Sequence, residues 1–227
     1  MLNNIKMALF DLDGTLVHSL PDLTLAVNAT LLELGLPEYL EPTIATWVGN
    51  GSRQLLKRAL TGEMEGEPDP DQLEHVMPLF FKHYEDNLSG ASHAYSGVEQ
   101  TLAVLQDAGI KMACVTNKPE KFAHILLQRL KLEQYFPVIV GGGTVPQLKP
   151  DPAPLLYACE QLGAPSRYAA DYGVMIGDSA SDMRAATAVG MPAVAVSYGY
   201  AQGKDLRQEG AAHIIDSMPD LIPLLVL

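Results

Sequence analysis

Residues 7–15 read MALFDLDGT and join a short apolar run to two acidic residues. The run Met7–Phe10 is continuous rather than alternating, which is typical of a strand buried on both faces of a parallel sheet. Asp11 and Asp13 follow it two residues apart, so in extended backbone both side chains point the same way. Open parallel sheets bind ligands beyond the carboxyl ends of their strands. We therefore expect a first strand at 7–10 and two carboxylates at the ligand-binding edge of a sheet.

Similar apolar runs recur along the chain, with helical patterns between them. Strand alternating with helix predicts an α/β fold, a Rossmann-like parallel sheet with helices on both faces. The expected helices are Val98–Ala108, Pro119–Leu130 and Pro152–Leu162, the last two opening with a proline suited to a first helical turn. The further expected strands are Met112–Val115, Val138–Val140, Val174–Ile176, Ala193–Val196 and Ile214–Ile215.

One segment breaks this alternation. Residues 19–92 contain helical patterns at Pro21–Leu34, Ser52–Leu60 and Asp71–Leu88, and no strand pattern. We therefore predict an α-helical cap domain of residues 19–92, inserted after the first strand into a core domain of residues 1–18 and 93–227. The alternative is one unbroken domain.

The bulk composition excludes several classes of partner. Of 227 residues, 48% are hydrophobic and 19% charged, as in ordinary globular proteins. The net charge of −12 disfavours nucleic acid and anionic lipid as partners. Cys114 and Cys159 are expected to be small core residues rather than a disulfide. With no signal-peptide pattern and no apolar run approaching membrane-spanning length, we expect a cytoplasmic monomer or homodimer.

Polar side chains also follow two other predicted strands. Thr116 and Asn117 come after the second strand, and Asp178 comes after the fourth. Lys149 precedes a proline between them, and Asp182 lies about one helical turn after Asp178. Each has a simpler interpretation alone: Thr116 as a helix cap, Lys149 as a solvated loop charge, Asp182 as a first-turn carboxylate. Together they place carboxylates, a hydroxyl, an amide and an ammonium at one edge of one sheet.

Such a set suits the transfer of a phosphoryl group. Asp11, Asp13 and Asp178 would repel one another and any phosphate unless a cation lay among them, and Mg²⁺ prefers oxygen ligands. With that cation and Lys149 the local field attracts phosphate despite the acidic surface. One carboxylate can then attack phosphorus, while a second gives and takes the proton.

Four short segments resemble the motifs of the haloacid dehalogenase superfamily, in that family's order. They are DLDGT at 11–15, Thr116, Lys149 before its proline, and GDSASD at Gly177–Asp182. The resemblance implies Asp11 as the nucleophile and Asp13 as the general acid/base.

The same resemblance implies how the metal and the phosphoryl group are held. Mg²⁺ would be bound by Asp11, the backbone carbonyl of Asp13, and Asp178, with Asp182 as a ligand or as support for the ligands. The residues expected to hold the phosphoryl oxygens are Thr116, Asn117 and Lys149.

Longer stretches are similar to the phosphoglycolate phosphatase branch of that family, including FDLDGTLVHSLPDL, VTNKPEKF and GDSASDMRAA. This similarity implies hydrolysis of 2-phosphoglycolate to glycolate and phosphate. The alternatives are a phosphatase of another small phosphate (a sugar phosphate, nucleotide or pyrophosphate), a phosphomutase of the β-phosphoglucomutase type, or a non-catalytic binding protein. One departure is His18, where the family usually has Asp; it is either a proton shuttle or a solvent-exposed hinge residue.

Candidate substrate contacts from the cap lie in and after the loop Gly49–Gly51. Asn50 lies in this loop, which could face the substrate. Arg53 and Lys57 lie four residues apart on the helix that follows, where a substrate carboxylate would need a cation. A solvated basic face accounts for both residues nearly as well.

Overall fold

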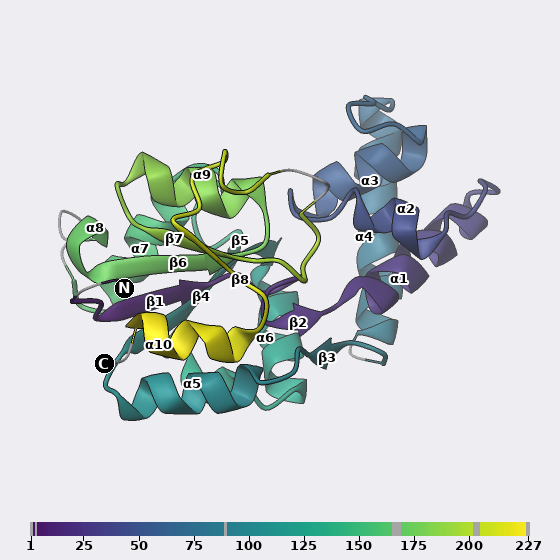
Figure 1. Ribbon diagram of the computed structural model, residues 1–227. Coiled ribbons are helices and arrows are strands. Elements are labelled where there is room, and N and C mark those ends of the chain that lie inside the picture. Colours follow the sequence, from purple (N-terminus) through teal and green to yellow (C-terminus); the bar gives the residue numbers. More distant parts are fainter. Residues whose placement is uncertain (1, 3, 89, 165–168, 202–204, 226–227) are drawn as a thin grey trace.

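The computed structural model describes residues 2, 4–88, 90–164, 169–201 and 205–225. Within them, one parallel sheet has the strand order β5-β4-β1-β6-β7-β8 (Figure 1). All the predicted strands of this sheet are confirmed, although β4 is longer than the expected run 112–115. The strands are β1 Met7–Phe10, β4 Lys111–Pro119, β5 Val138–Gly142, β6 Gly173–Gly177, β7 Ala193–Val196 and β8 His213–Ile215.

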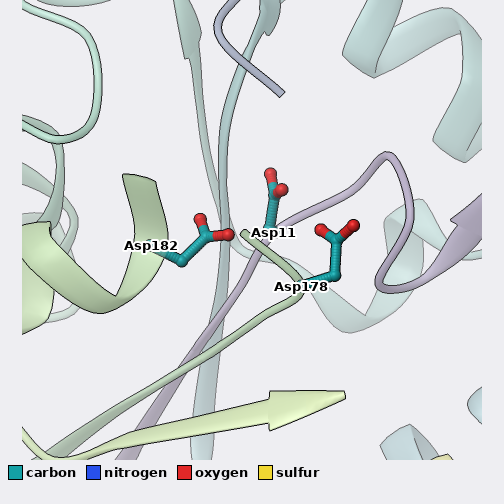
Figure 2. A group of neighbouring side chains, drawn as sticks. All are labelled: Asp11, Asp178 and Asp182. Atoms are coloured by element: carbon teal, nitrogen blue, oxygen red, sulfur yellow. The ribbon is translucent and has the colours of Figure 1, made fainter. Parts of the chain in front are cut away.

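The topology places a ligand-binding crevice next to β1. The chain runs outward from β1 to β4 and β5, then returns to the other side of β1 to form β6. Phe10 is therefore paired with Cys114 of β4 on one side and Ile176 of β6 on the other. Ligands bind at such a switch point, beyond the carboxyl ends of the strands. Asp11 and Asp178, which follow β1 and β6, lie there (Figure 2).

Helices cover both faces of the sheet, as the sequence predicts. Successive residues of β1 alternate between the faces: Ala8 and Phe10 pack in one apolar cluster, and Met7 and Leu9 pack in another. All four are buried. The first face is covered by α5 (Val98–Asp107), α6 (Glu120–Arg129), α10 (Ile222–Leu225) and the 3-10 helices η1 (Glu133–Tyr135) and η3 (Met218–Leu221). The second face is covered by α7 (Ala153–Gln161) and α9 (Ala180–Ala188). The short helix α8 (Ala169–Tyr172) precedes β6.

Two of the helices that cover the sheet start one residue away from the prediction. α6 begins at Glu120, because Pro119 has extended backbone (ψ 134°) and still belongs to β4. α7 begins at Ala153, with Pro152, the expected first helical residue, in the N-cap position. The Asp151 carboxylate nevertheless accepts a hydrogen bond from the Ala153 N–H, so it satisfies one of the free donors of the first turn.

Four helices lie between two short strands at one end of the sheet (Figure 1). Asp69 caps the last of them by accepting hydrogen bonds from the N–H groups of Asp71 and Gln72. The strands β2 and β3 pair antiparallel, but each has only two residues, too few for a detectable pattern. These four helices are called the cap helices below, and their forming a separate domain of residues 19–92 stays a prediction. The elements are β2 Val17–His18, α1 Leu20–Glu33, α2 Glu41–Ala45, α3 Ser52–Thr61, α4 Pro70–Asn87 and β3 His93–Ala94.

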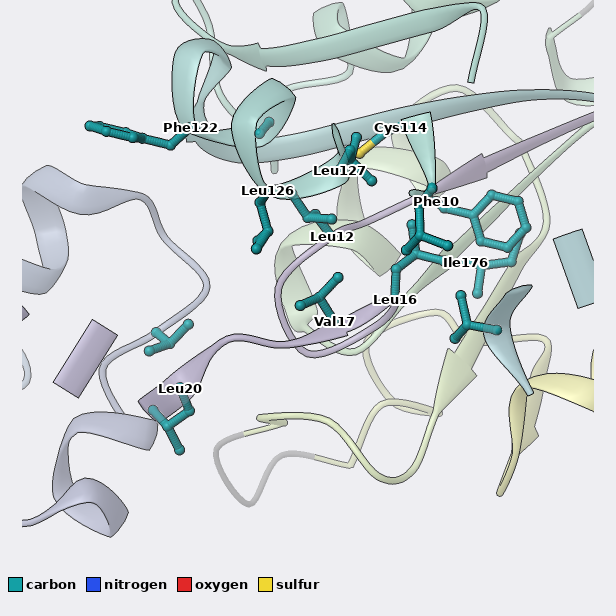
Figure 3. Close-up of a cluster of buried hydrophobic side chains, with 14 of the residues drawn as sticks. Phe10, Leu12, Leu16, Val17, Leu20, Cys114, Phe122, Leu126, Leu127 and Ile176 are labelled. Atoms are coloured by element: carbon teal, nitrogen blue, oxygen red, sulfur yellow. The ribbon is translucent and has the colours of Figure 1, made fainter. Parts of the chain in front are cut away.

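The helices α1–α4 share an apolar core with one face of the sheet. Phe10, Leu12 and Leu16 lie near the sheet, and the cluster extends past Leu126 to Leu20 at the start of α1 (Figure 3). Val27 of α1 and Phe80 of α4 belong to the same cluster. This shared burial holds the four helices over the carboxyl end of the sheet. None of the described helices combines the length and apolar character needed to cross a bilayer.

A buried carboxylate ties α1 to the segment that returns to the sheet. Asp22 is fully buried and accepts hydrogen bonds from the N–H of Ala91 (2.8 Å), the N–H of Ser92 (3.2 Å) and the hydroxyl of Ser92. These contacts join the two chain segments that connect the helices to the sheet.

Replacing Asp22 by alanine is therefore expected to lower the free energy of unfolding by about 3 kcal/mol, because the buried N–H and hydroxyl of Ser92 and the N–H of Ala91 lose their acceptor. Urea denaturation measures this change. The matched control is Asp86→Ala on the exposed side of α4, which should change stability by no more than about 0.5 kcal/mol. Equal effects of the two substitutions would contradict the assigned role of Asp22.

Candidate active site

Three buried carboxylates meet at the carboxyl edge of the sheet. One oxygen each from Asp11, Asp178 and Asp182 lies within 4.8 Å of the others. Asp11 follows β1, Asp178 follows β6, and Asp182 lies in the first turn of α9 (Figure 2). Residues 167 positions apart in the chain are thus brought together by the pairing of β1 with β6.

The glycine after Asp13 lets Asp178 reach this position. Gly14 has a φ of +87°, and a Cβ atom there would lie 2.2 Å from Oδ2 of Asp178. The hydroxyl of Thr15 donates to Oδ1 of Asp178 at 3.2 Å, and the N–H of Tyr200 donates to Oδ2 at 2.6 Å. The DGT sequence therefore provides both the space and one of the hydrogen bonds that fix the carboxylate.

Lys149 brings a positive charge into the same cluster. Its ammonium lies 3.0 Å from Oδ1 of Asp11 and 2.6 Å from Oδ1 of Asp182, and it also donates to the carbonyl of Val115. The side chain of Asn117 holds the backbone of Lys149: Oδ1 accepts from the Lys149 N–H at 2.9 Å, and Nδ2 donates to its carbonyl at 2.8 Å. In this arrangement Asn117 positions Lys149, and it also lines the cavity described below. Its contact with phosphoryl oxygens, which the family resemblance implies, stays a prediction.

Burial shifts the titration of these groups. It raises the pKa of Asp11 to about 7; the Lys149 ammonium opposes this shift and the charge of Asp182 adds to it. The pKa of Asp178 lies well above its ordinary value because of burial and then the charges of Asp11 and Asp182. Burial alone would lower the pKa of Lys149, but Asp11 and Asp182 raise it above its usual range.

Three carboxylates facing one ammonium leave an excess of negative charge in a dry site. Carboxylate oxygens are the ligands that a hard divalent cation prefers, so this cluster fits Mg²⁺. Asp182 is the least available of the three, because Oδ2 accepts from the N–H (3.0 Å) and the hydroxyl (2.7 Å) of Ser179 and Oδ1 accepts from Lys149. Of the two roles left open by the sequence, these contacts favour support of the ligands over ligation.

Asp13 has a partner that sequence reasoning missed. The ammonium of Lys118 lies 2.9 Å and 3.1 Å from the two carboxylate oxygens of Asp13 and also donates to the hydroxyl of Tyr84 in α4. The signal was present in the sequence, because Lys118 stands in the VTNKPEKF stretch two residues after Thr116. Thr116 itself is buried, and its hydroxyl accepts from the N–H of Lys118.

A cavity of about 40 Å³ opens between these residues and the cap helices. Asp11, Asp13 and Thr116 line it from the sheet side, and Leu55 and Tyr84 line it from the cap side. The carboxylates of Asp11 and Asp13 therefore face the same cavity.

The three cap residues expected to contact the substrate have different kinds of partners in the structure. Asn50 donates to the hydroxyl of Ser181 at 3.2 Å, so it links the cap loop to the start of α9. Arg53 is exposed and paired with Glu74, while Lys57 is paired with Glu67. These pairs are typical of a solvated basic face, and neither cation lines the cavity.

His18 is only partly exposed, which differs from the interpretation of a solvent-exposed hinge residue. Its Nδ1 lies 3.3 Å from the hydroxyl of Tyr95 and 3.0 Å from that of Tyr200. Burial, followed by the nearby His93, lowers the pKa of His18. The two tyrosine rings cover the histidine at the β2–β3 pair, and it is not among the residues that line the cavity.

Comparison with known proteins agrees with this geometry. The haloacid dehalogenase-like hydrolase family matches residues 8–196. The chain is 43% identical to phosphoglycolate phosphatase of Nitrosococcus oceani, over 99% of this chain and 98% of that one, and 43% identical to the Pseudomonas syringae pv. syringae protein of the same name, over 96% and 79%. The crystal structure of a predicted phosphoglycolate phosphatase from Haemophilus somnus is similar over 99% of both chains, with a TM-score of 0.89 and 34% identity. The chain belongs to the haloacid dehalogenase-like hydrolase family.

Proposed function

We propose that this enzyme is a Mg²⁺-dependent phosphatase that hydrolyses 2-phosphoglycolate to glycolate and phosphate. The observation that carries the proposal is the convergence of Asp11, Asp178 and Lys149 on one edge of the sheet, beside a cavity that Asp13 also lines. The substrate is suggested by relatives named phosphoglycolate phosphatase that match nearly the whole chain. The net charge of −12 supports a small metabolite over a nucleic acid as the substrate.

In the first step, a carboxylate oxygen of Asp11 attacks phosphorus as the bond from phosphorus to the leaving oxygen breaks. Asp13 donates its proton to that oxygen, which leaves as the hydroxyl of glycolate. The phosphoryl group is then held as an aspartyl-phosphate on Asp11. Bound Mg²⁺ would supply positive charge against the phosphoryl oxygens and the carboxylates Asp11 and Asp178.

In the second step, Asp13 takes a proton from water as the water oxygen attacks phosphorus. The bond between phosphorus and Asp11 breaks, phosphate leaves, and Asp11 is again a free carboxylate. Lys149 stays within reach of Asp11 through both steps, because Asp182 and Asn117 hold its two ends. Preorganised charge of this kind requires no rearrangement during the reaction.

The substitution Asp11→Asn removes the nucleophile with almost no change in volume. We expect kcat to fall by about 10⁴-fold or more, while the circular dichroism spectrum stays that of the original chain. Asp107→Asn, at the exposed end of α5, is the control and should keep full activity. An Asp11→Asn variant with more than about 1% of the original kcat would rule out the aspartyl-phosphate mechanism.

Mg²⁺ affinity should rise with pH between 6 and 8. The raised pKa of Asp11, about 7, means that its carboxyl must lose a proton before it can bind the cation, and Asp178 is shifted in the same direction. At a pH below the pKa of a ligand carboxyl, the Mg²⁺ affinity can rise by up to about tenfold per pH unit for each proton that binding releases. Titration calorimetry at several pH values measures this, and an affinity that does not change with pH would contradict the ligand assignment.

The substrate is tested with a panel of phosphate esters in the presence and absence of Mg²⁺. We expect kcat/KM for 2-phosphoglycolate to exceed that for sugar phosphates and nucleotides by about 100-fold or more, and chelation of the metal to abolish activity. If another phosphate ester is preferred by a similar factor, the substrate assignment is wrong while the phosphatase assignment stands.

A further inference from the structure

Lys118 is the basic side chain that faces the candidate substrate cavity. Among the described residues lining that cavity it is the one Lys, Arg or His, and it is only 5% exposed. Lys149 lies deeper and is bound to Asp11 and Asp182, while Arg53 and Lys57 are paired with glutamates on the outer face of the cap. An anionic group that enters the cavity away from the carboxylates Asp11, Asp178 and Asp182 therefore meets the ammonium of Lys118.

The partners of Lys118 come from both walls of the cavity. Its ammonium donates to both oxygens of Asp13 on the sheet side and to the hydroxyl of Tyr84 on the cap side. A buried cation without partners is strongly disfavoured, so these contacts keep it in place when no ligand is bound. Burial would lower the pKa of Lys118, but Asp13 and Tyr84 raise it, so the ammonium stays charged.

The distance of Lys118 from the reacting oxygen matches a short acidic leaving group. Asp13, as proton donor, must lie within one hydrogen bond of the leaving oxygen. Lys118 in turn lies one hydrogen bond from Asp13. In 2-phosphoglycolate a single methylene group separates the ester oxygen from the carboxylate, so the carboxylate reaches this position when the phosphoryl group is at Asp11. Leu23 and Leu55 on the cap side of the cavity offer it no charge.

We propose that Lys118 is the specificity-determining residue that binds the carboxylate of the substrate's leaving group. On binding, one N–H of the ammonium turns from Asp13 or Tyr84 to the entering carboxylate, which the three donors of the lysine allow. This inference rests on the proposed function. It adds that the enzyme selects phosphate esters with a carboxylate one carbon from the ester oxygen, through a residue of the sheet and not through the basic face of the cap.

The test compares 2-phosphoglycolate with its neutral amide, phosphoglycolamide, which has nearly the same shape. We expect the original chain to prefer the carboxylate by about 100-fold in kcat/KM. The neutral amide brings no negative charge to the buried ammonium of Lys118, which therefore gains no ion pair with this substrate. In Lys118→Met this ratio should fall below about fivefold. Loss of the contact to Asp13 slows both substrates alike, so the ratio isolates the contact with the carboxylate. Lys121→Met, which removes an exposed core-to-cap ion pair with Glu85, is the matched control and should keep the ratio.

Each outcome of this experiment decides between named alternatives. A preference below about threefold in the original chain, or a ratio unchanged in Lys118→Met, overturns the role of Lys118. Lys118→Gln, which keeps a donor for Asp13 and removes the charge, gives the same comparison if the methionine variant does not fold. If the original chain hydrolyses neither compound but acts on another phosphate ester, the proposed function fails as well, and this result is distinct from a failure of Lys118 alone.

Discussion

Carboxylates at the centre of this protein are buried with too little positive charge to balance them. Asp11, Asp178 and Asp182 meet within 4.8 Å, and Lys149 is the ammonium that contacts Asp11 and Asp182. Bringing such charges out of water is unfavourable unless they are paired or bind a cation. The raised pKa values of Asp11 and Asp178 are the direct consequence. In the proposed function, the same imbalance would attract Mg²⁺ and, with it, a phosphate ester.

The fold supplies the rigid frame that this arrangement requires. Pairing of β1 with β4 and β6 fixes the positions from which Asp11, Thr116 and Asp178 project. Hydrogen bonds from Thr15 and Tyr200 orient Asp178, and Asn117 holds Lys149 by its backbone. The helices α1–α4 share an apolar cluster with the sheet, and residues of α1, α3 and α4 line the cavity from the other side. Geometry held by packing and by outer hydrogen bonds is what catalysis by positioned charge depends on.

Most of the fold and part of the candidate site could be predicted from the sequence. Apolar runs indicate the strands, and the carboxyl ends of parallel strands gather at one edge of the sheet. The strand at 7–10 follows from its continuous apolar run, and the meeting of Asp11 and Asp178 follows from the rule for strand ends. Lys118 lies in a stretch that carries the family resemblance, but its pairing could not be predicted, because its partners Asp13 and Tyr84 lie 105 and 34 residues away and no local pattern links them. The strands β2 and β3 are too short to carry periodicity, and the surroundings of His18 depend on Tyr200, 182 residues away. Local patterns thus predict elements and shared edges, whereas side-chain pairs between distant segments require the structure.

The central claim is that Asp11 carries the phosphoryl group between the two halves of the reaction. The most direct measurement is mass spectrometry of peptides from enzyme that has been quenched in acid during turnover of 2-phosphoglycolate with Mg²⁺. We expect a peptide containing Asp11 that is heavier by one phosphoryl group, with the modification on Asp11 itself. A phosphoryl group found on Asp13 or Asp178, or turnover with no phosphorylated peptide in enzyme quenched under conditions that preserve acyl phosphates, would contradict it.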